Sequence, residues 1–224
     1  MNRRCREFVP IGKMKLTIKA KDELLTHFDA LLEQHGFKRP KRSQLWRKQI
    51  SNEVSQFIHL NFGLYEREKQ IVVNPSVAVR FESIEADCLE SGMITSASAA
   101  RANFGKSLQQ ISGRTYEWSD GENSSALAEK IYRDLVSYGL KYLQQISDLE
   151  QVLGLLKSSE PKKWCTESRS SRARYLPLAL VRASRVDEAL SLLPELAKDI
   201  QGLDQMIPDF QNFTSWFSEK YGRS

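Results

Sequence analysis

The stretch Val54-Ser-Gln-Phe-Ile-His-Leu-Asn-Phe-Gly-Leu64 decides the fold, because large apolar residues occupy every second position along most of it. The apolar members of this alternation are Ile58, Leu60, Phe62 and Leu64. Successive side chains of a strand point to opposite faces of a sheet, so the pattern predicts a strand with one buried face.

Two further strands are predicted beside it. Gln44–Gln49 precedes it through a hairpin at Ser51-Asn-Glu53, and Ile71–Phe81 follows it. The short connections predict antiparallel pairing. Pro75 lacks a backbone N–H, which predicts an edge position or a break in the third strand.

Two shorter segments, Phe104–Ile111 and Arg114–Trp118, are compatible with strands separated by a turn at Ser112-Gly113. The sheet is therefore expected to have four or five strands. Residues 83–97 show no pattern that assigns them to a helix or a strand.

A helix is predicted on each side of the sheet segment. Apolar residues recur at three- and four-residue spacing from Lys19 to His35, and Gly36 follows where a helix commonly ends. After the turn at Asp120–Ser125, a second helix is predicted to run to Leu143. A third begins after Ser147, whose side chain is expected to cap it.

The last third of the chain is predicted to be helical after a polar segment. Ser158–Arg174 is rich in Lys, Arg, Ser and Pro, which predicts a linker or an exposed loop. Beyond it we expect a helix pair, Tyr175–Ala183 and Val186–Ile200, and a final helix that opens at Pro208.

Together these elements predict an α+β fold with an N-terminal helix, a curved antiparallel sheet of four to five strands and C-terminal helices. The predicted division is a flexible extension at residues 1–15, an α+β domain at 16–157, a linker or exposed loop at 158–174 and a helical appendage at 175–224. A chain of 224 residues has ample material for a core without disulfides or metals.

From the composition we expect a cytoplasmic protein. No apolar run approaches the ~20 residues that span a bilayer, and no apolar stretch follows the basic start as in a signal peptide. The three cysteines, Cys5, Cys88 and Cys165, are odd in number and far apart, unlike a disulfide framework or a Cys-x-x-Cys metal site. We therefore expect a reducing compartment and no contact with a membrane.

The sequence contains no recognisable catalytic or metal-binding motif, so we expect a protein that is not an enzyme and that uses no cofactor or metal. Gly105-Lys106-Ser107 resembles the end of a phosphate-binding loop, but Ala100 stands where that motif needs a glycine, so Lys106 is expected to be a surface lysine. The histidines lack the ligand spacing of a zinc site. His59, on the polar face of its strand, is expected to be a sheet residue rather than a general base.

Positive charge is concentrated near the N-terminus. Residues 1–50 hold 13 Lys and Arg against 5 Asp and Glu, whereas the rest of the chain holds 20 against 23. The densest part is Lys38–Lys48, where Trp46 lies among the cations. Such a mixture of basic and aromatic residues is used by single-stranded nucleic-acid platforms, although the aromatic pattern of an RNA-recognition sheet is missing. A solvated basic surface without a ligand is the plainer alternative.

Several segments resemble an uncharacterised bacterial domain-of-unknown-function family, in which a helix ending in Gly-Phe-Lys/Arg precedes an antiparallel sheet and C-terminal helices. The resemblance covers about residues 17–157. The segments that carry it are Leu31-Leu-Glu-Gln-His-Gly-Phe-Lys38, Leu45-Trp-Arg47, Ile58-His-Leu-Asn-Phe62, Tyr116-Glu-Trp118 and Tyr138-Gly-Leu-Lys-Tyr-Leu143. Some similar bacterial proteins are immunity proteins encoded beside toxins, and the family offers no catalytic residues to carry over.

The resemblance implies a non-enzymatic protein-binding module, an immunity protein that neutralises a cognate toxin by steric occlusion. The alternative is a nucleic-acid-binding protein that uses the same basic segment. The exposed sheet face and the Ser158–Arg174 loop are further candidate contact surfaces. The residues predicted to contact the partner are Lys38, Arg39, Lys41, Arg42, Trp46 and Lys48.

Overall fold

A computed structural model describes residues 11–41, 43–65, 70–94, 102–119, 123–166, 168–202 and 207–222. The first helix, α1, covers Ile11–Glu33 and so begins eight residues before the predicted start at Lys19. Residues 11–15, which were expected in a flexible extension, therefore belong to a helix. The rest of the predicted extension, residues 1–10, lies outside the described residues, as does Arg42.

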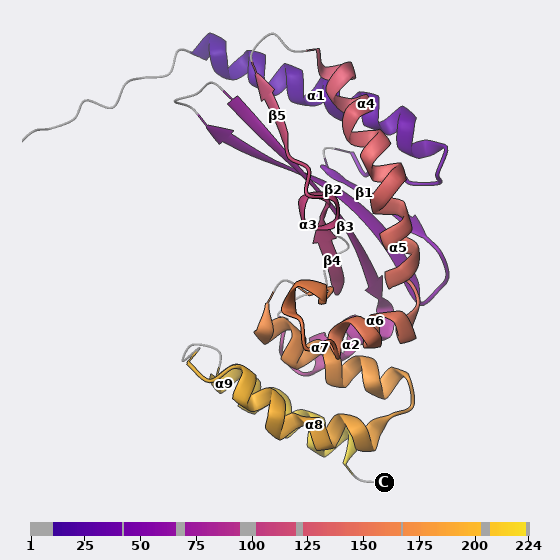
Figure 1. Cartoon of the computed structure of the whole chain (residues 1–224), viewed down its shortest axis with the longest axis vertical. Helices are drawn as coiled ribbons and strands as arrows, with labels where there is room; N and C mark the ends of the chain where they lie inside the picture. The colour runs from indigo at the N-terminus through magenta and orange to yellow at the C-terminus, as the bar shows by residue number, and fades with distance from the viewer. Residues whose placement is uncertain are drawn as a thin grey trace, which may run out of the picture.

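The predicted α+β class is confirmed, with a five-stranded antiparallel sheet (Figure 1). The order is β1-β2-β3, and both β4 and β5 pair with the free side of β3. The strands are β1 Leu45–Gln49, β2 Val54–Tyr65, β3 Gln70–Phe81, β4 Phe104–Ser107 and β5 Tyr116–Ser119.

Pro75 lies in the middle of β3, which is neither an edge strand nor broken. The N–H of its partner Leu60 donates to the Gln44 carbonyl on the side of β1, so the ring nitrogen of Pro75 faces away from β2. On that side β4 ends opposite Ser76 and β5 begins opposite Val73. The proline thus sits at the gap between two short strands, where no ladder hydrogen bond is required.

A short helix separates these two strands. The prediction of an extended segment to Ile111 is wrong, because α3 covers Leu108–Ser112. Ser107 caps α3 by accepting a hydrogen bond from the Gln110 N–H, while the Gln110 side chain accepts from the Ser107 N–H. This reciprocal capping stops the strand after four residues, and Gly113 ends the helix in the left-handed conformation at φ 74°.

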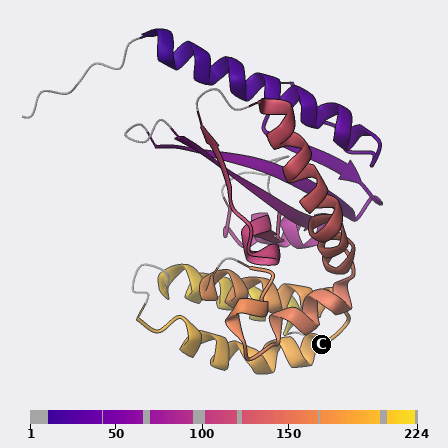
Figure 2. The ribbon, with the colours of Figure 1, turned by 45° about the horizontal axis from the view of Figure 1, so that its top comes forward.

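One long helical segment packs on the sheet face that carries Trp46 and Ile58. It consists of α4 Ser124–Asp134, a π-helical turn at Leu135–Gly139, and α5 Leu140–Ile146. Helix α1 lies beside α4 over the same face, and its Phe28 ring centroid is 5.8 Å from that of Trp46 (Figure 2). These helices bury the apolar positions of the alternating strands.

The remaining helices gather at the end of the sheet where β3 finishes (Figure 1). The segment left unassigned in sequence forms α2 there. These helices are α2 Glu82–Glu90, α6 Leu149–Leu156, α7 Arg169–Arg182, α8 Val186–Asp199 and α9 Ile207–Tyr221. The cap of α6 is Asp148, one residue after the predicted Ser147, because the Asp148 carboxylate accepts from the Gln151 N–H.

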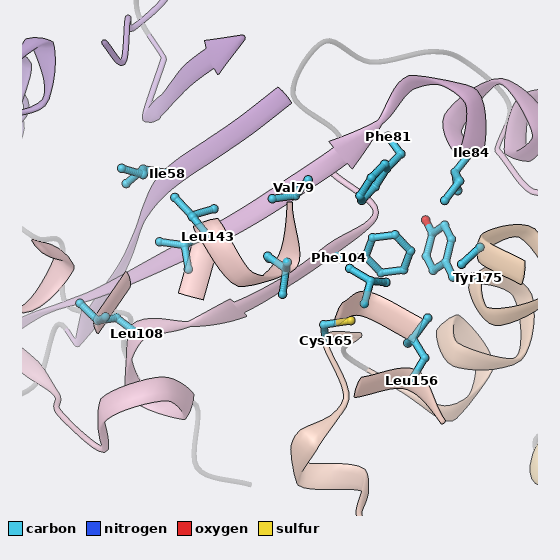
Figure 3. Close-up of a cluster of buried hydrophobic side chains, with 14 of the residues drawn as sticks. Ile58, Val79, Phe81, Ile84, Phe104, Leu108, Leu143, Leu156, Cys165 and Tyr175 are labelled. Atoms are coloured by element: carbon cyan, nitrogen blue, oxygen red, sulfur yellow. The ribbon is translucent and has the colours of Figure 1, made fainter. Parts of the chain in front are cut away.

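The core is continuous from the sheet into these C-terminal helices. Phe104 of β4 meets Phe81 of β3 and Tyr175 of α7 edge to face, at centroid distances of 5.8 and 5.5 Å (Figure 3). Cys165 and Leu156 extend the same cluster. The helices after residue 174 therefore pack against the sheet body rather than hanging from it.

The segment predicted as a linker differs from an exposed loop in two ways. Residues 169–174 already belong to α7, and Trp164 and Cys165 are buried. The Gly105 N–H of β4 donates to the Cys165 carbonyl at 2.8 Å, so the segment covers the outer edge of that strand. The prediction of an exposed loop followed the mostly polar composition, but the buried side chains of Trp164 and Cys165 are enough to fix the segment on the protein.

Candidate partner-binding surface

The segment Lys38–Lys48 leaves the C-terminal end of α1 and returns as β1. Gly36 lies in the turn that follows α1 and has φ 79°, a conformation that favours glycine, and the next residue, Phe37, is buried. The Lys38 N–H donates to the Arg47 carbonyl and the Arg47 N–H donates to the Lys38 carbonyl, both at 2.9 Å. This bridge covers the outer edge of β1 at Arg47 and fixes the start of the loop.

Asp29 of α1 holds the middle of the loop. Its Oδ1 accepts from Arg39 Nε at 2.7 Å and its Oδ2 from Arg39 Nη2 at 2.5 Å, a bidentate ion pair. Oδ1 also accepts from the Trp46 indole N–H at 2.9 Å. Arg39 Nη1 donates to the Ser43 carbonyl. Asp29 therefore holds the loop at Arg39 and at Trp46, and Arg39 closes the turn between them. The hydrogen bond with Asp29 raises the pKa of Arg39.

Two of the predicted contact residues therefore have structural tasks. Trp46 is 0% exposed, packs against Phe28 and lies under the Arg39 guanidinium at 5.6 Å from its ring centroid. The prediction that Trp46 contacts a partner needs correction, because its position on the inner face of β1 buries the ring. Arg39 keeps only 18% of its side chain exposed and is occupied by Asp29.

All three lysines among the predicted contact residues reach the surface. Lys38 and Lys41 are exposed, and Lys48 is partly exposed with its amine 5.9 Å from the Phe37 ring centroid. We call Lys38, Lys41 and Lys48, together with the fixed Arg39, the basic corner. Lys38, Arg39 and Lys41 lie on the loop between α1 and β1, which is held by the Lys38–Arg47 bridge and the Asp29–Arg39 pair, and Lys48 lies in β1.

The second predicted surface, the polar face of the sheet, is organised by a charge network. Arg47 Nη2 donates to Ser55 Oγ at 2.9 Å and to Glu82 Oε1 at 3.3 Å, and Arg80 Nε donates to Glu82 Oε2 at 2.8 Å. His59 shares this face, and burial lowers its pKa. The network ties the β1-β2 hairpin to the start of α2, so it stabilises the fold at this end of the sheet.

Lys106 differs from the predicted surface lysine. Its amine donates to the Lys162 carbonyl at 2.6 Å and lies 5.8 Å from the Tyr142 ring centroid. Burial lowers the pKa of this amine, and burial also raises the pKa of the neighbouring Cys165 to about 12. A thiol with that pKa is protonated at neutral pH, so it is poorly suited to act as a nucleophile.

A second carboxylate that holds elements together, the buried Asp87 of α2, was not predicted from sequence. Its side chain is 2% exposed and receives Arg182 of α7, together with Lys220 at 3.1 Å and the Tyr221 hydroxyl at 3.0 Å from α9. Asp87 thus fastens two C-terminal helices to the end of the sheet. Neither Asp29 nor Asp87 stands in a motif, so no local signal in the sequence indicates its role.

Over the part of the chain that the structure describes, no group of three or more His, Cys, Asp or Glu side chains is arranged to hold a metal ion. Within the same residues, no helix has both the length and the apolar character needed to cross a membrane. Comparison of the chain with protein-family models, with curated proteins and with solved structures gives no match.

Proposed function

We propose that the chain is a non-enzymatic protein-binding module, an immunity protein that neutralises a cognate toxin by occluding it. The observation that carries the proposal is the basic corner, in which surface lysines project from a loop pinned by Asp29 and by the Lys38–Arg47 bridge. The resemblance of residues 17–157 to a family with immunity proteins supplies the class of partner.

A fixed loop suits recognition of a protein surface. A backbone that is held before binding loses less conformational entropy when the complex forms. A standard interface of about 1,600 Å² extends well beyond four side chains, so the basic corner would supply one charged part of it. Clustered cations steer an acidic partner into contact and mainly raise the association rate.

Burial of Trp46 and Trp118 favours a protein over a single-stranded nucleic acid as the partner. The nucleic-acid alternative depends on aromatic rings that stack on bases. Trp46 is 0% and Trp118 is 4% exposed, so neither ring is available for stacking. The lysines that remain are suited to carboxylates on an acidic protein as well as to phosphates, and the experiment must separate these two ligands.

The experiment uses the double variant Lys38→Glu/Lys41→Glu and the candidate toxin encoded beside this protein. The matched control is Lys19→Glu/Lys198→Glu, which makes the same change in net charge at two exposed positions away from the corner. We expect the corner variant to bind roughly tenfold more weakly at low salt, mainly through slower association, and the difference to shrink as salt rises. Melting temperatures should stay close to wild type, because exposed charges contribute little to folding.

Three results would count against the proposal. Equal binding by the corner variant and the control would remove the basic corner from the interface. Failure of the wild type to bind or protect against the neighbouring toxin would remove the immunity function for that pair. Binding of random single-stranded RNA or DNA at physiological salt, lost in the corner variant alone, would assign the corner to nucleic acid instead.

A further inference from the structure

The strands β1 and β2 differ in length, and the difference leaves one end of β2 without a neighbour on one side. β1 pairs with Ser55–His59, whereas β2 continues to Tyr65 and pairs with β3 along its whole length. Figure 1 shows this far end of β2 at the opposite end of the sheet from α2 and α7. Residues 61–65 therefore have β3 on one side and no described strand on the other.

The backbone groups that face the open side follow from the register. The Leu60 N–H donates to the Gln44 carbonyl at 3.0 Å, on the side of β1. The backbone groups of every second residue point to the same side of a strand, so those of Phe62 and Leu64 also point away from β3. None of the described residues forms a backbone hydrogen bond with Phe62 on that side. This edge thus offers backbone donors and acceptors to an added strand.

Gln44 marks the point where the paired part of the edge ends. Oriented to satisfy both of its neighbours, its side-chain amide donates to the Leu60 carbonyl at 2.8 Å and accepts from the Lys21 amine of α1. Gln44 thus pairs with both outward backbone groups of Leu60. The next residue that faces this side is Phe62, so the edge changes there from closed to open.

The other edges of the sheet are covered or short. The Lys38–Arg47 bridge covers β1, the Gly105 N–H of β4 donates to the Cys165 carbonyl, and β5 has only four residues. Natural sheets protect their edges in such ways, because an unpaired edge is a template for another strand. The far end of β2 differs from these edges, and an extended segment of a partner protein can pair with its backbone groups.

Lys21 indicates the charge of such a segment. Its amine lies 4.8 Å from the Phe62 ring centroid, over the sheet face on which that ring lies. Its contact with Gln44 involves a neutral amide, and none of the described carboxylates forms an ion pair with it. A residue directly opposite Phe62 on an added strand would place its side chain on the same face. A carboxylate at that position would pair with Lys21.

We propose that residues 61–65 form a docking site, the β2 edge, for an extended segment of a partner protein that places an Asp or Glu opposite Phe62. The segment adds antiparallel to β2, as β1 does, because this pairing is the more stable one per residue. Charge disfavours a second copy of this chain, since pairing of two β2 edges about Phe62 would bring two Lys21 amines together. The β2 edge shares no residue with the basic corner, and the proposal does not rest on the function proposed for that corner.

The test uses the full chain labelled with ¹⁵N and the capped peptide Thr-Val-Thr-Val-Thr-Glu-Thr. With its Glu opposite Phe62, the backbone groups of that Glu and of the second Val face β2. In the free protein the Phe62 amide should exchange with solvent faster than the amides of Asn61 and Gly63, which face β3. Peptide at about 80% saturation should slow exchange at Phe62 about fivefold, because mainly the unbound fraction exchanges.

Two N-methylated forms of the peptide isolate the backbone contribution. Methyl groups on the amides of the second Val and of the Glu remove the donors that face β2, and they should weaken binding at least about tenfold. Methyl groups on the amides of the two Thr that flank the second Val face solvent, and they should change binding by less than about twofold. The two forms have the same composition, so their difference reports strand pairing.

The variants Lys21→Gln and Lys19→Gln isolate the contribution of charge. Lys21→Gln should weaken binding of the peptide about threefold, but it should hardly change binding of a peptide with Gln in place of Glu. Lys19 lies in the same helix and is 76% exposed, so Lys19→Gln should leave both affinities unchanged. Lys38→Glu/Lys41→Glu should also leave them unchanged. Melting temperatures of all variants exclude loss of folding as the cause.

Four results would overturn the proposal. They are equal binding by the two methylated peptides, no slowing of exchange at Phe62 at the highest soluble peptide concentration, an equal effect of Lys21→Gln on the Glu and Gln peptides, and slow exchange of the Phe62 amide in the free protein. In the last case, exchange that becomes faster on dilution would assign the edge to a second copy of the chain. Failure of the neighbouring toxin to bind at the basic corner would concern the corner alone.

Discussion

Asp29 offers the sharpest test of how the basic corner is built, because its two oxygens serve two different partners. Replacing it by asparagine removes the charge that binds Arg39 but keeps an oxygen that accepts from the Trp46 indole. Replacing it by alanine removes both. The comparison of Asp29→Asn with Asp29→Ala therefore isolates the hydrogen bond to a fully buried ring.

The expected magnitudes follow from exposure. Asp29 is 40% and Arg39 18% exposed, so solvent screening reduces their ion pair to about 1 kcal/mol, and Asp29→Asn should cost about that much. In Asp29→Ala the buried indole N–H of Trp46 also loses its acceptor, which adds roughly 1–3 kcal/mol. The alanine variant should therefore lose about 2–4 kcal/mol in all.

The assay is urea unfolding followed by tryptophan fluorescence. With a slope of about 2–3 kcal/mol per molar urea, Asp29→Ala should lower the midpoint by roughly 1 M. Arg39→Gln should cost more than Asp29→Asn, because it also loses the hydrogen bond to the Ser43 carbonyl and the contact with the Trp46 ring. The double variant Asp29→Asn/Arg39→Gln should cost little more than Arg39→Gln alone, since both changes remove the same ion pair. Equal midpoints for Asp29→Ala and Asp29→Asn would refute the reasoning about the indole.

Three other perturbations test the remainder of the structure. Asp87→Ala should lower the free energy of unfolding by about 2–4 kcal/mol, because it leaves the partly buried Arg182 and Lys220 without their shared carboxylate. Glu90→Gln, at a carboxylate that is 56% exposed, should have a much smaller effect in the same melting experiment. Iodoacetamide at neutral pH should leave the peptide that contains Cys165 unlabelled until the chain unfolds, and rapid labelling of folded protein would contradict the burial that raises its pKa to about 12. Burial lowers the pKa of His59, so the contribution of the neutral imidazole to stability should be complete above about pH 6.5 and should decline as the pH falls below that value. His59→Gln should therefore remove part of the loss in urea midpoint between about pH 7.5 and about pH 5.5. Identical dependence of the urea midpoint on pH in the variant and the wild type would count against this.

Elements with a strong local period were predictable from the sequence. The first three strands and the helices from Val186 and Pro208 were placed within a few residues, because alternation and helical spacing are properties of neighbouring residues. Helix α2 was missed because Ile84 and Cys88 are its only buried apolar side chains. The helical turn after Ser107 was missed because the capping pair with Gln110 interrupts an otherwise extended pattern.

The contact residues were harder to predict because pairing across the fold is not a local property. Arg39 and Trp46 stand among lysines in the sequence, and composition alone groups them with a basic surface. Their common partner, Asp29, lies in α1 ten residues before Arg39, and only the packing of α1 on β1 brings it near Trp46. For Lys38, Lys41 and Lys48 composition was enough, because the structure leaves these cations at the surface.

The exposed lysines of the basic corner should act on how fast a partner arrives more than on how long it stays. Surface cations act over a distance, so they govern the association rate, whereas tightly packed contacts govern the dissociation rate. Lys38→Glu/Lys41→Glu should therefore slow association about tenfold with little change in dissociation. Kinetics measured at two salt concentrations check this, because the effect of exposed lysines should fade at high salt. An effect on dissociation alone, unchanged by salt, would mean that these lysines act through direct packing rather than through steering.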